Sequence, residues 1–119
     1  YTKNAPDAIG PYSQAKVTMG LVFTSGQIAI NPATGAVEAT DIKGQTKQVC
    51  ENLKAVLEAA NSSLDKAVKT VCFLADMGDF AAFNEVYGEY FTSKPARSCV
   101  AVKTLPKNVL VEVEVIAEV

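Results

Sequence analysis

The sequence predicts an α+β fold in which two helices cover one face of a single mixed sheet. Runs with an apolar residue at every second position, typical of strands, lie near both ends and in the middle of the chain. Two longer stretches repeat their apolar residues at steps of three and four, as helices do. The resulting order is β-β-α-β-α-β-β, and 119 residues fit one domain over residues 1–119. Two helices can cover only one face of such a sheet, so the other face must meet solvent or another subunit.

The N-terminal region predicts an irregular segment followed by two strands. Gly10-Pro11 is a turn signal that would fix how Tyr12 is presented, either toward a site or as an aromatic plug at the edge of the core. Strands are expected over residues 14–19 and 21–28. Ser25-Gly26 interrupts the second strand, and a glycine there marks a bulge or a close approach of the backbone to a ligand. Most such glycines are only structural, so this signal is weak alone.

The first predicted helix runs from about Asp41 to Ala60. Its start is marked by a capping residue, Thr40 or Asp41, and its end by Asn61. The apolar stripe that would face the core is Val49, Leu53, Val56, Leu57 and Ala60.

A buried strand and a second helix are predicted next. Residues 68–75 are largely apolar on both faces, which predicts a central strand. Gly78-Asp79 then caps a helix that ends near Thr92-Ser93, before Pro95. Asn84 flanks the buried stripe of this helix, which consists of Phe80, Phe83, Tyr87 and either Tyr90 or Phe91.

The C-terminal region predicts a hairpin between residues 95–102 and 109–119. The second run alternates, and its valines share one face that would cover the core. If residues of the first run pair across from it, Arg97 and Cys99 share the other face with Glu112 and Glu114. That cluster is either a solvated cross-strand ion pair, which pattern alone favours, or a site. Leu110 and Ile116 on the glutamate face, and Pro95 before Arg97, favour the site.

Composition excludes several classes of function. No apolar run approaches the length of a membrane span, and a net charge of −2 without a basic run argues against nucleic-acid binding. The chain has no histidine, which removes Ser-His and Cys-His nucleophile pairs and most zinc or iron sites. Its three cysteines lack metal-ligand spacing and suit a reducing compartment, so a cytoplasmic location is expected. The sequence begins at Tyr1 without methionine, so the expectation of a cytoplasmic location does not exclude a targeting peptide that has been removed.

Four blocks of the sequence, in order and at matching spacings, resemble the RidA (YjgF-like) family of enamine and imine deaminases. The resemblance covers nearly the whole chain and rests on Ile9 to Ala15, Ser25 to Ile28, Asp79-Phe80 with Asn84 and Tyr87, and Pro95 to Glu114. It implies a chorismate-mutase-like fold and a homotrimer with sites between subunits. It also implies hydrolysis of 2-imino acids, such as 2-iminobutanoate and 2-iminopropanoate, to 2-keto acids and ammonia without a cofactor or metal.

The chemistry of the residues fits this implied reaction. Arg97 would grip the substrate carboxylate through two parallel hydrogen bonds, and Glu112 would orient or deprotonate the attacking water. The binding residues expected around them are Tyr12, Ser25, Gly26, Asn84, Arg97 and Cys99. Cys99 is expected to line the site rather than attack, because without a histidine or a nearby lysine nothing obvious lowers the pKa of its thiol.

One departure and two alternatives accompany the resemblance. Between Phe91 and Pro95 the chain has only Thr92-Ser93-Lys94, where the family usually has a longer segment with an aromatic before the proline, so substrate size preference stays open. A regulatory trimer that binds 2-keto acids without turnover is the first alternative. A ribonuclease or translation inhibitor is the second, and the acidic charge balance and the missing histidine argue against it.

Overall fold

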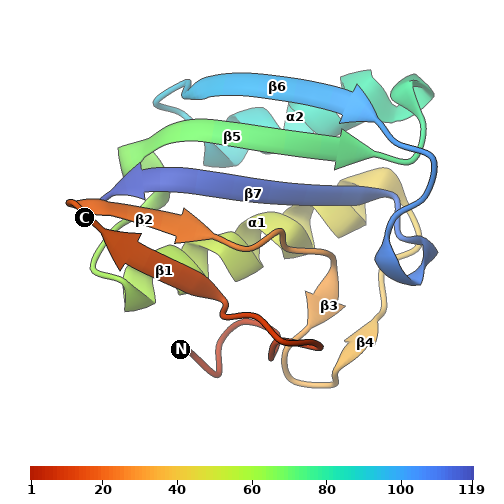
Figure 1. The fold of residues 1–119 in the computed structure, drawn as a ribbon. Helices are drawn as coiled ribbons and strands as arrows, with labels where there is room; N and C mark the ends of the chain where they lie inside the picture. Colours follow the sequence, from red (N-terminus) through yellow and green to blue (C-terminus); the bar gives the residue numbers. More distant parts are fainter.

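The computed structural model describes all residues from 1 to 119 and contains one five-stranded mixed sheet (Figure 1). The strand order is β1-β2-β7-β5-β6, with β5 and β6 parallel and all other neighbours antiparallel. The strands are β1 Ala15–Thr18, β2 Leu21–Thr24, β5 Ala67–Leu74, β6 Ala96–Ala101 and β7 Val111–Glu118. The predicted α+β class is confirmed, and so is the central place of the strand now seen as β5.

A small second sheet was not expected. The predicted strand over residues 21–28 leaves the main sheet after Thr24, and β3 (Ile30–Asn31) then pairs with β4 (Ala36–Val37). The turn between them contains Gly35 with φ of 73°, a left-handed conformation that glycine adopts without strain.

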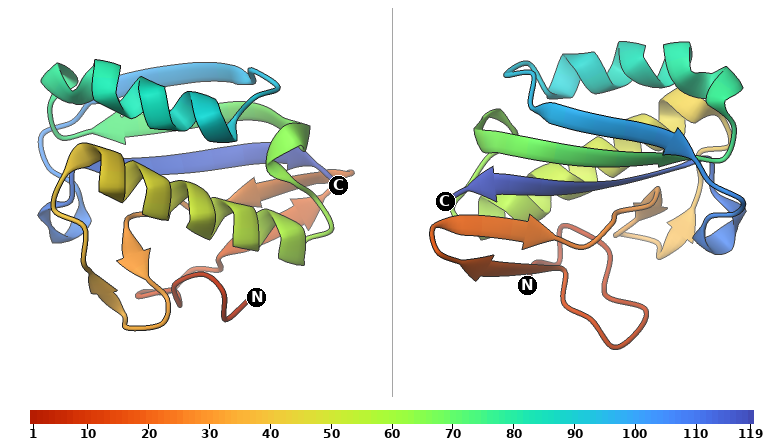
Figure 2. Two further views of the ribbon diagram at one scale, coloured as in Figure 1. Left: turned by 180° about the vertical axis from the view of Figure 1, so that it is seen from behind. Right: turned by 45° about the horizontal axis from the view of Figure 1, so that its top comes forward.

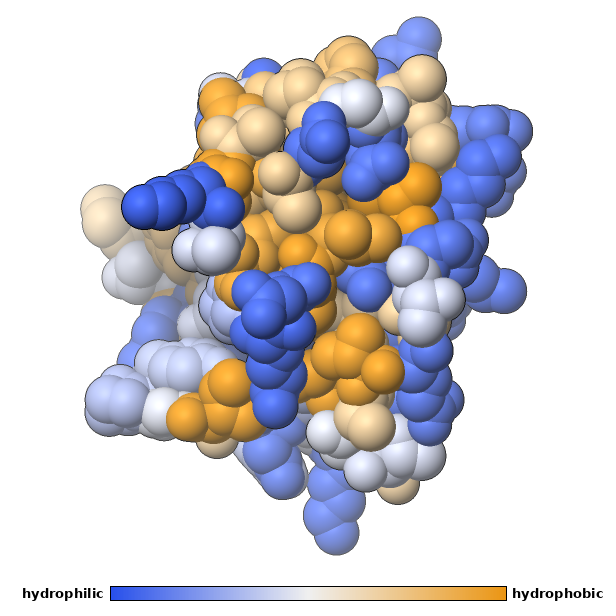
Figure 3. All heavy atoms as spheres, turned by 90° about the vertical axis from the view of Figure 1, so that its right-hand side faces the viewer, coloured by the Kyte–Doolittle hydropathy of each residue, from blue (hydrophilic) through white to orange (hydrophobic).

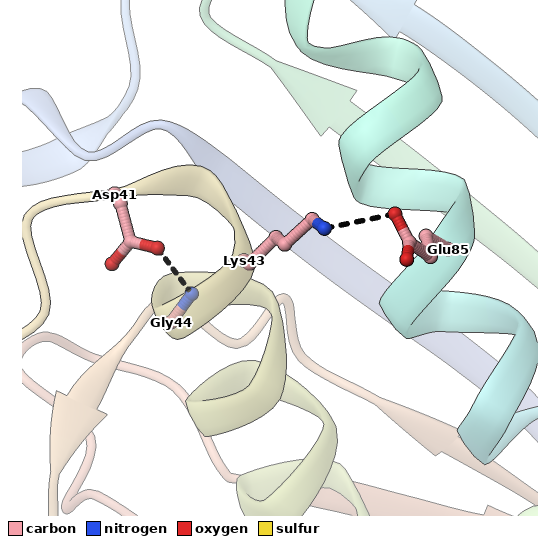
Figure 4. Close-up of polar contacts among 4 residues, drawn as sticks. All are labelled: Asp41, Lys43, Gly44 and Glu85. Atoms are coloured by element: carbon pink, nitrogen blue, oxygen red, sulfur yellow. Dashed lines mark hydrogen bonds and ion pairs between the residues drawn. The ribbon is translucent and has the colours of Figure 1, made fainter.

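The two helices begin and end close to where the sequence predicts. Helix α1 (Ile42–Ala59) is capped by Asp41, whose carboxylate accepts a hydrogen bond from the Gly44 N–H at 3.2 Å. Helix α2 spans Phe80–Tyr90. Lys43 Nζ lies 2.8 Å from Glu85 Oε2 and joins the two helices (Figure 4), although an exposed pair of this kind contributes little stability. The short 3-10 helices are η1 Leu64–Lys66, η2 Met77–Asp79 and η3 Pro106–Asn108.

Both helices lie on the same face of the sheet, as the left view of Figure 2 shows. The main core lies between them and the sheet, where β7 buries Val111, Val113, Val115 and Ala117. A smaller core of Ile28, Ile30, Leu105 and Val109 lies at the end of the molecule where β5 and β6 end. Figure 3 looks onto this end and shows hydrophobic residues in the middle with hydrophilic residues around them. Neither helix has the length and apolar composition that crossing a membrane requires.

The predicted C-terminal hairpin is wrong. Strand β5 lies between β6 and β7, so the two C-terminal strands do not pair (Figure 1). The physical reason is the α2 crossover, which places β6 parallel to β5 and beside it. The chain then returns past the end of β5 and fills its other side with β7.

This order separates Arg97 from Glu112. Arg97 pairs with Thr70 of β5, which pairs with the buried Val115, so Arg97 is on the helix-covered face. Glu112 pairs with Phe73, three residues further along β5 and therefore on the opposite face. The prediction that Arg97 and Cys99 share a face with Glu112 and Glu114 within one chain is therefore wrong. Val100 pairs with Phe73 as well and is 48% exposed on the uncovered face.

Candidate functional site

A cavity of about 520 Å³ opens on the face of the sheet that the helices leave uncovered. Three parts of the chain form its walls: the segment before β1, the segment after β2 and the start of β7. Four of the predicted site residues line it, namely Tyr12, Ser25, Gly26 and Glu112.

The segment after β2 forms a bulge over β7. The Thr24 hydroxyl accepts a hydrogen bond from the Val115 N–H at 3.0 Å, and Gln27 exchanges two backbone hydrogen bonds with Val113. Between these anchors the backbone at Gly26 passes so close to Glu112 that an added Cβ would overlap the carboxylate. The predicted bulge is confirmed, and glycine is required there for space rather than for its φ angle. The Gly26 N–H has no acceptor within the chain.

The segment before β1 is held by a buried amide. Gln14 Nε2 donates hydrogen bonds to the carbonyls of Thr2 and Pro6 at 3.0 and 2.8 Å, and its Oε1 accepts one from the Thr2 N–H. Tyr12 belongs to the same segment, and its hydroxyl accepts a hydrogen bond from the Ile9 N–H at 3.2 Å. The Tyr12 side chain is 49% exposed at the rim of the cavity, so it is not a plug of the core.

Glu112 is the titratable group with a perturbed pKa in this cavity. Partial burial, and secondly the nearby charge of Glu114, raise the pKa of its carboxyl above the ordinary value. The carboxylate has neither an ion-pair partner nor a hydrogen-bond donor within the chain. A half-buried carboxylate whose pKa lies above the usual glutamate range is a stronger base than an exposed one, which suits proton transfer from water.

The other predicted residues gather on the opposite face, beneath α2. Arg97 Nη1 donates a hydrogen bond to Asn84 Oδ1 at 2.7 Å. The guanidinium carbon lies 4.9 Å from the centre of the Tyr87 ring, and the rings of Phe80 and Phe83 are at 5.4 and 6.0 Å. No carboxylate of the chain pairs with this half-buried cation, since the one ion pair is Lys43–Glu85. The guanidinium is therefore free to bind an anion.

Cys99 is beside Arg97 but is not set up as a nucleophile. It is half-buried against the main core, opposite Cys72 in the register. Burial raises the pKa of the Cys99 thiol, and the smaller effect of Arg97 lowers it. The thiol therefore stays protonated, and only a thiolate attacks efficiently. Cys50 and Cys72 are fully buried in the main core.

A second cavity of about 350 Å³ borders Arg97 at the end of α2. Thr92 and Lys94 line this cavity. The segment between Phe91 and Pro95, which is shorter here than is usual in the RidA family, therefore lies next to the guanidinium. Sequence reasoning missed Thr24 and Gln14 in the first group and Thr70 in the second. In the second group, Asn84, Arg97 and Cys99 were expected from the family motifs. The α2 stripe was a further signal, since Phe80, Asn84 and Tyr87 recur at helical spacing. No three His, Cys, Asp or Glu side chains lie close enough together to hold a metal ion.

Comparison with known proteins places the whole chain in one family. Residues 2–119 match the family described as Endoribonuclease L-PSP. The chain belongs to this family, which includes the RidA proteins. The resemblance seen in the sequence is thereby confirmed.

Relatives of this L-PSP/RidA family member match along nearly their full length. A RutC family protein of Pyrococcus horikoshii is 56% identical over 118 residues, covering 98% of this chain and 94% of the relative. A protein of Salmonella typhimurium named 2-iminobutanoate/2-iminopropanoate deaminase is 49% identical over 120 residues, covering 98% and 93%. Among solved structures, the Rid family protein YyfA from Yersinia pestis superposes with a TM-score of 0.97 at 50% identity, covering 100% and 96%. The fold predicted from the resemblance is confirmed by this likeness.

Proposed function

We propose that this L-PSP/RidA family member hydrolyses reactive 2-imino acids and their enamine tautomers, such as 2-iminobutanoate and 2-iminopropanoate, to 2-keto acids and ammonia. The observation that carries the proposal is the half-buried Arg97 guanidinium, which has one amide partner and no carboxylate in the chain. The deaminase name of the Salmonella relative, 49% identical over almost the whole chain, supports the same reaction.

Arg97 binds the substrate carboxylate. Its planar fork matches a carboxylate with two parallel hydrogen bonds, which a lysine ammonium does not reproduce. Asn84 holds one end of the guanidinium and leaves its other N–H donors for the ligand. This grip fixes the adjacent C=N carbon relative to the water that attacks it.

Glu112 acts as the general base for the attacking water. Its carboxylate takes a proton as the water oxygen bonds to the C=N carbon, and it returns that proton to the nitrogen. The resulting carbinolamine transfers its hydroxyl proton to the nitrogen as the C–N bond breaks, which forms the keto group and releases ammonia. The unpartnered N–H of Gly26 lies at the same wall and can donate to the substrate, with Ser25 beside it and Tyr12 closing the rim. Imine hydrolysis has a low barrier in water, so positioning alone supplies a useful acceleration. The proposed reaction requires no cofactor and no covalent step at Cys99.

The site is completed by a second copy of the chain. Within one chain Arg97 and Glu112 are on opposite faces of the sheet, so they can act on one substrate only if different copies supply them. A homotrimer built on the uncovered face provides such sites. That face carries exposed or half-buried Phe23, Val100 and Ile116 beside the glutamates, a mixture more typical of an interface than of a solvated surface.

Two other functions are the alternatives to imine hydrolysis. The family description favours RNA cleavage, although a net charge of −2 and the absence of histidine are a poor match for a polyanionic substrate. A regulatory trimer would keep the carboxylate grip of Arg97 and turn nothing over.

The deciding experiment is a coupled assay. A pyridoxal-phosphate-dependent dehydratase generates the imine, and 2-keto acid release is timed with and without this protein. We expect faster release with wild-type protein and none of that acceleration with Arg97→Ala. Binding of 2-oxobutanoate without acceleration would identify a regulatory trimer, and cleavage of RNA without acceleration would identify a ribonuclease.

A further inference from the structure

The Tyr87 ring beneath the Arg97 guanidinium is itself fixed by a buried hydrogen bond. The Tyr87 hydroxyl lies 2.7 Å from Thr70 Oγ1, and the ring centre lies 4.9 Å from the guanidinium carbon of Arg97. Thr70 is also the β5 residue that pairs with Arg97 in the sheet. The three side chains therefore form a closed set that joins β5, α2 and β6.

This hydroxyl pair is shielded from solvent, and Tyr87 also borders the second cavity beside Arg97. Thr70 is 0% exposed and Tyr87 is 7% exposed. Burial raises the pKa of Tyr87, so its phenol stays neutral at physiological pH. Two buried hydroxyls that lack water must find partners, and here one donates a hydrogen bond to the other. The pair thus fixes where the ring lies in the gap between α2 and the sheet.

The Arg97 side chain depends on that ring for its orientation. Its one hydrogen bond within the chain goes to Asn84, which fixes a single nitrogen. A guanidinium held at one nitrogen can still tilt about that bond, and a ring against its face restricts the tilt. Arginine has many rotamers, and ordering it at the moment of binding weakens affinity.

We propose that Thr70 and Tyr87 are positioning residues that hold the Arg97 guanidinium plane ready for a carboxylate. The role rests on the proposed function, because it concerns the carboxylate grip of that same site. Both residues act through Arg97 rather than through hydrogen bonds of their own to the ligand, because their hydroxyls pair with each other. Thr70 fixes the Tyr87 ring, the ring fixes the guanidinium plane, and the plane sets the direction of two parallel hydrogen bonds.

A purely structural role for the pair would look different in a suitable set of variants. Tyr87→Phe leaves the Thr70 hydroxyl buried without its partner, which lowers stability. Combining Tyr87→Phe with Thr70→Val replaces both hydroxyls by apolar groups of similar shape, which restores most of that stability. The double variant therefore separates the stability of the fold from the orientation of Arg97.

The experiment measures kcat and KM for imine hydrolysis, Kd for 2-oxobutanoate and Tm for each of these variants. We expect KM and Kd to rise about three- to tenfold in Tyr87→Phe and in the double variant, the range for losing one preorganised side chain. The kcat should stay unchanged, because a loosened guanidinium still makes both hydrogen bonds once the carboxylate is bound, so the cost falls on binding. Tyr87→Leu, which removes the ring, should raise Kd by about tenfold or more. Tyr90→Phe on the same helix is the matched control. It removes a tyrosine hydroxyl away from Arg97 and should leave kcat, KM and Kd unchanged, whatever its effect on Tm.

Wild-type KM and Kd in the double variant would overturn the positioning role. A fall in kcat that follows Tm at constant KM would overturn it as well, because that is the mark of a smaller folded fraction. If wild-type protein binds 2-oxobutanoate but hydrolyses no imine, the proposed catalysis fails, while the Kd series still decides the positioning role. Wild-type protein that binds no 2-keto acid overturns both proposals.

Discussion

At the scale of single residues, the protein holds a free cation on one face of its sheet and a free carboxylate on the other. Arg97 is half-buried among aromatic rings with one amide partner, and Glu112 is half-buried without any partner in the chain. Leaving such groups unpaired costs stability, since partly buried charges are normally paired. Their retention is a mark of function, and each supports a prediction.

Substitution of Arg97 tests the carboxylate grip. Arg97→Ala should abolish measurable turnover, because losing the only cationic partner of a buried carboxylate costs roughly 3–5 kcal/mol. Arg97→Lys should recover little of it, because an ammonium cannot reproduce the planar two-bond fork. The measurements are 2-keto acid release and 2-oxobutanoate affinity. Near-wild-type affinity in Arg97→Lys would mean that a point charge suffices and that the bidentate grip is absent.

Substitution of Glu112 tests the base. The rate should fall as pH drops through the Glu112 pKa, since the protonated carboxyl cannot accept a proton, and the raised pKa places this fall above the usual glutamate range. Glu112→Gln should slow turnover, keep 2-oxobutanoate affinity and remove this acid limb. A Gln variant with an unchanged pH profile would show that another group titrates.

The same substitution should affect stability with a definite sign. A carboxyl whose pKa is raised by folding binds its proton more tightly in the folded state. Its contribution to the free energy of unfolding is therefore present at low pH and is lost as pH rises through the folded pKa. Wild-type protein therefore carries a cost at neutral pH that Glu112→Gln lacks. We expect the variant to have the higher Tm at neutral pH, with the difference shrinking in acid. A lower Tm at neutral pH would contradict the assigned cause.

At the scale of elements, the bulge after β2 sets the geometry of the cavity. Thr24 and Gln27 anchor it to β7, and the backbone between them presses against Glu112. Only a residue without Cβ fits there. The cavity wall is thus specified by two backbone anchors and one glycine rather than by the strand pattern.

Gly26→Ala tests the role of this close approach. The added methyl group must displace the Glu112 carboxylate, so we expect kcat to fall roughly tenfold or more. Gly35→Ala is the matched control. It introduces strain of about 1–2 kcal/mol at a positive φ in the distant β3–β4 turn and should lower Tm without changing turnover by the folded protein. Equal kcat values in the two variants would show that the close approach of Gly26 to Glu112 does not affect catalysis.

Sequence patterns predicted where the helices and strands lie along the chain better than they predicted which strands pair in the sheet. The helical period and the caps placed α1 and α2 within a few residues, because both signals are local. Alternation likewise identified the buried valines of β7. Alternation fixes which residues of one strand share a face, but it carries no information about which strands pair. The sequence therefore could not reveal that β5 lies between β6 and β7, and Arg97 was placed on the wrong face for that reason.

The residues around the site were predictable to different degrees. The motifs that resemble the RidA family identified Tyr12, Gly26 and Arg97 without any structure. Thr70 and Gln14 carry no such signal, since they act through a long-range hydrogen bond or through carbonyls of an irregular segment. Contacts of this kind depend on tertiary packing, which periodicity does not encode.

At the scale of the whole molecule, the uncovered face should bind other copies of the chain. Phe23 and Ile116 are paired on that face in the register of β2 and β7, and Phe23 remains 39% exposed. Burying apolar area of this kind stabilises an assembly by roughly 25 cal/mol per Å².

Light scattering at micromolar concentration tests this assembly. We expect a mass of a trimer of 12.6 kDa chains for wild type and a lower mass for Phe23→Glu, because a charge at the interface would be desolvated. Val17→Glu changes an exposed valine of the adjacent strand on the other face of the sheet and should leave the trimer intact. A monomeric wild type would contradict a site shared between copies.

The most direct measurement is complementation between two inactive variants. Arg97→Ala and Glu112→Gln proteins are unfolded, mixed in equal amounts and refolded together, with each variant refolded alone as the control and the trimer mass checked. If Arg97 and Glu112 come from different copies, random cyclic assembly gives about a quarter of the sites an intact pair, and imine hydrolysis should return to about that fraction of wild type. If both residues of a site came from one chain, no mixed trimer would contain an intact site, and activity no greater than that of the variants alone would contradict the account.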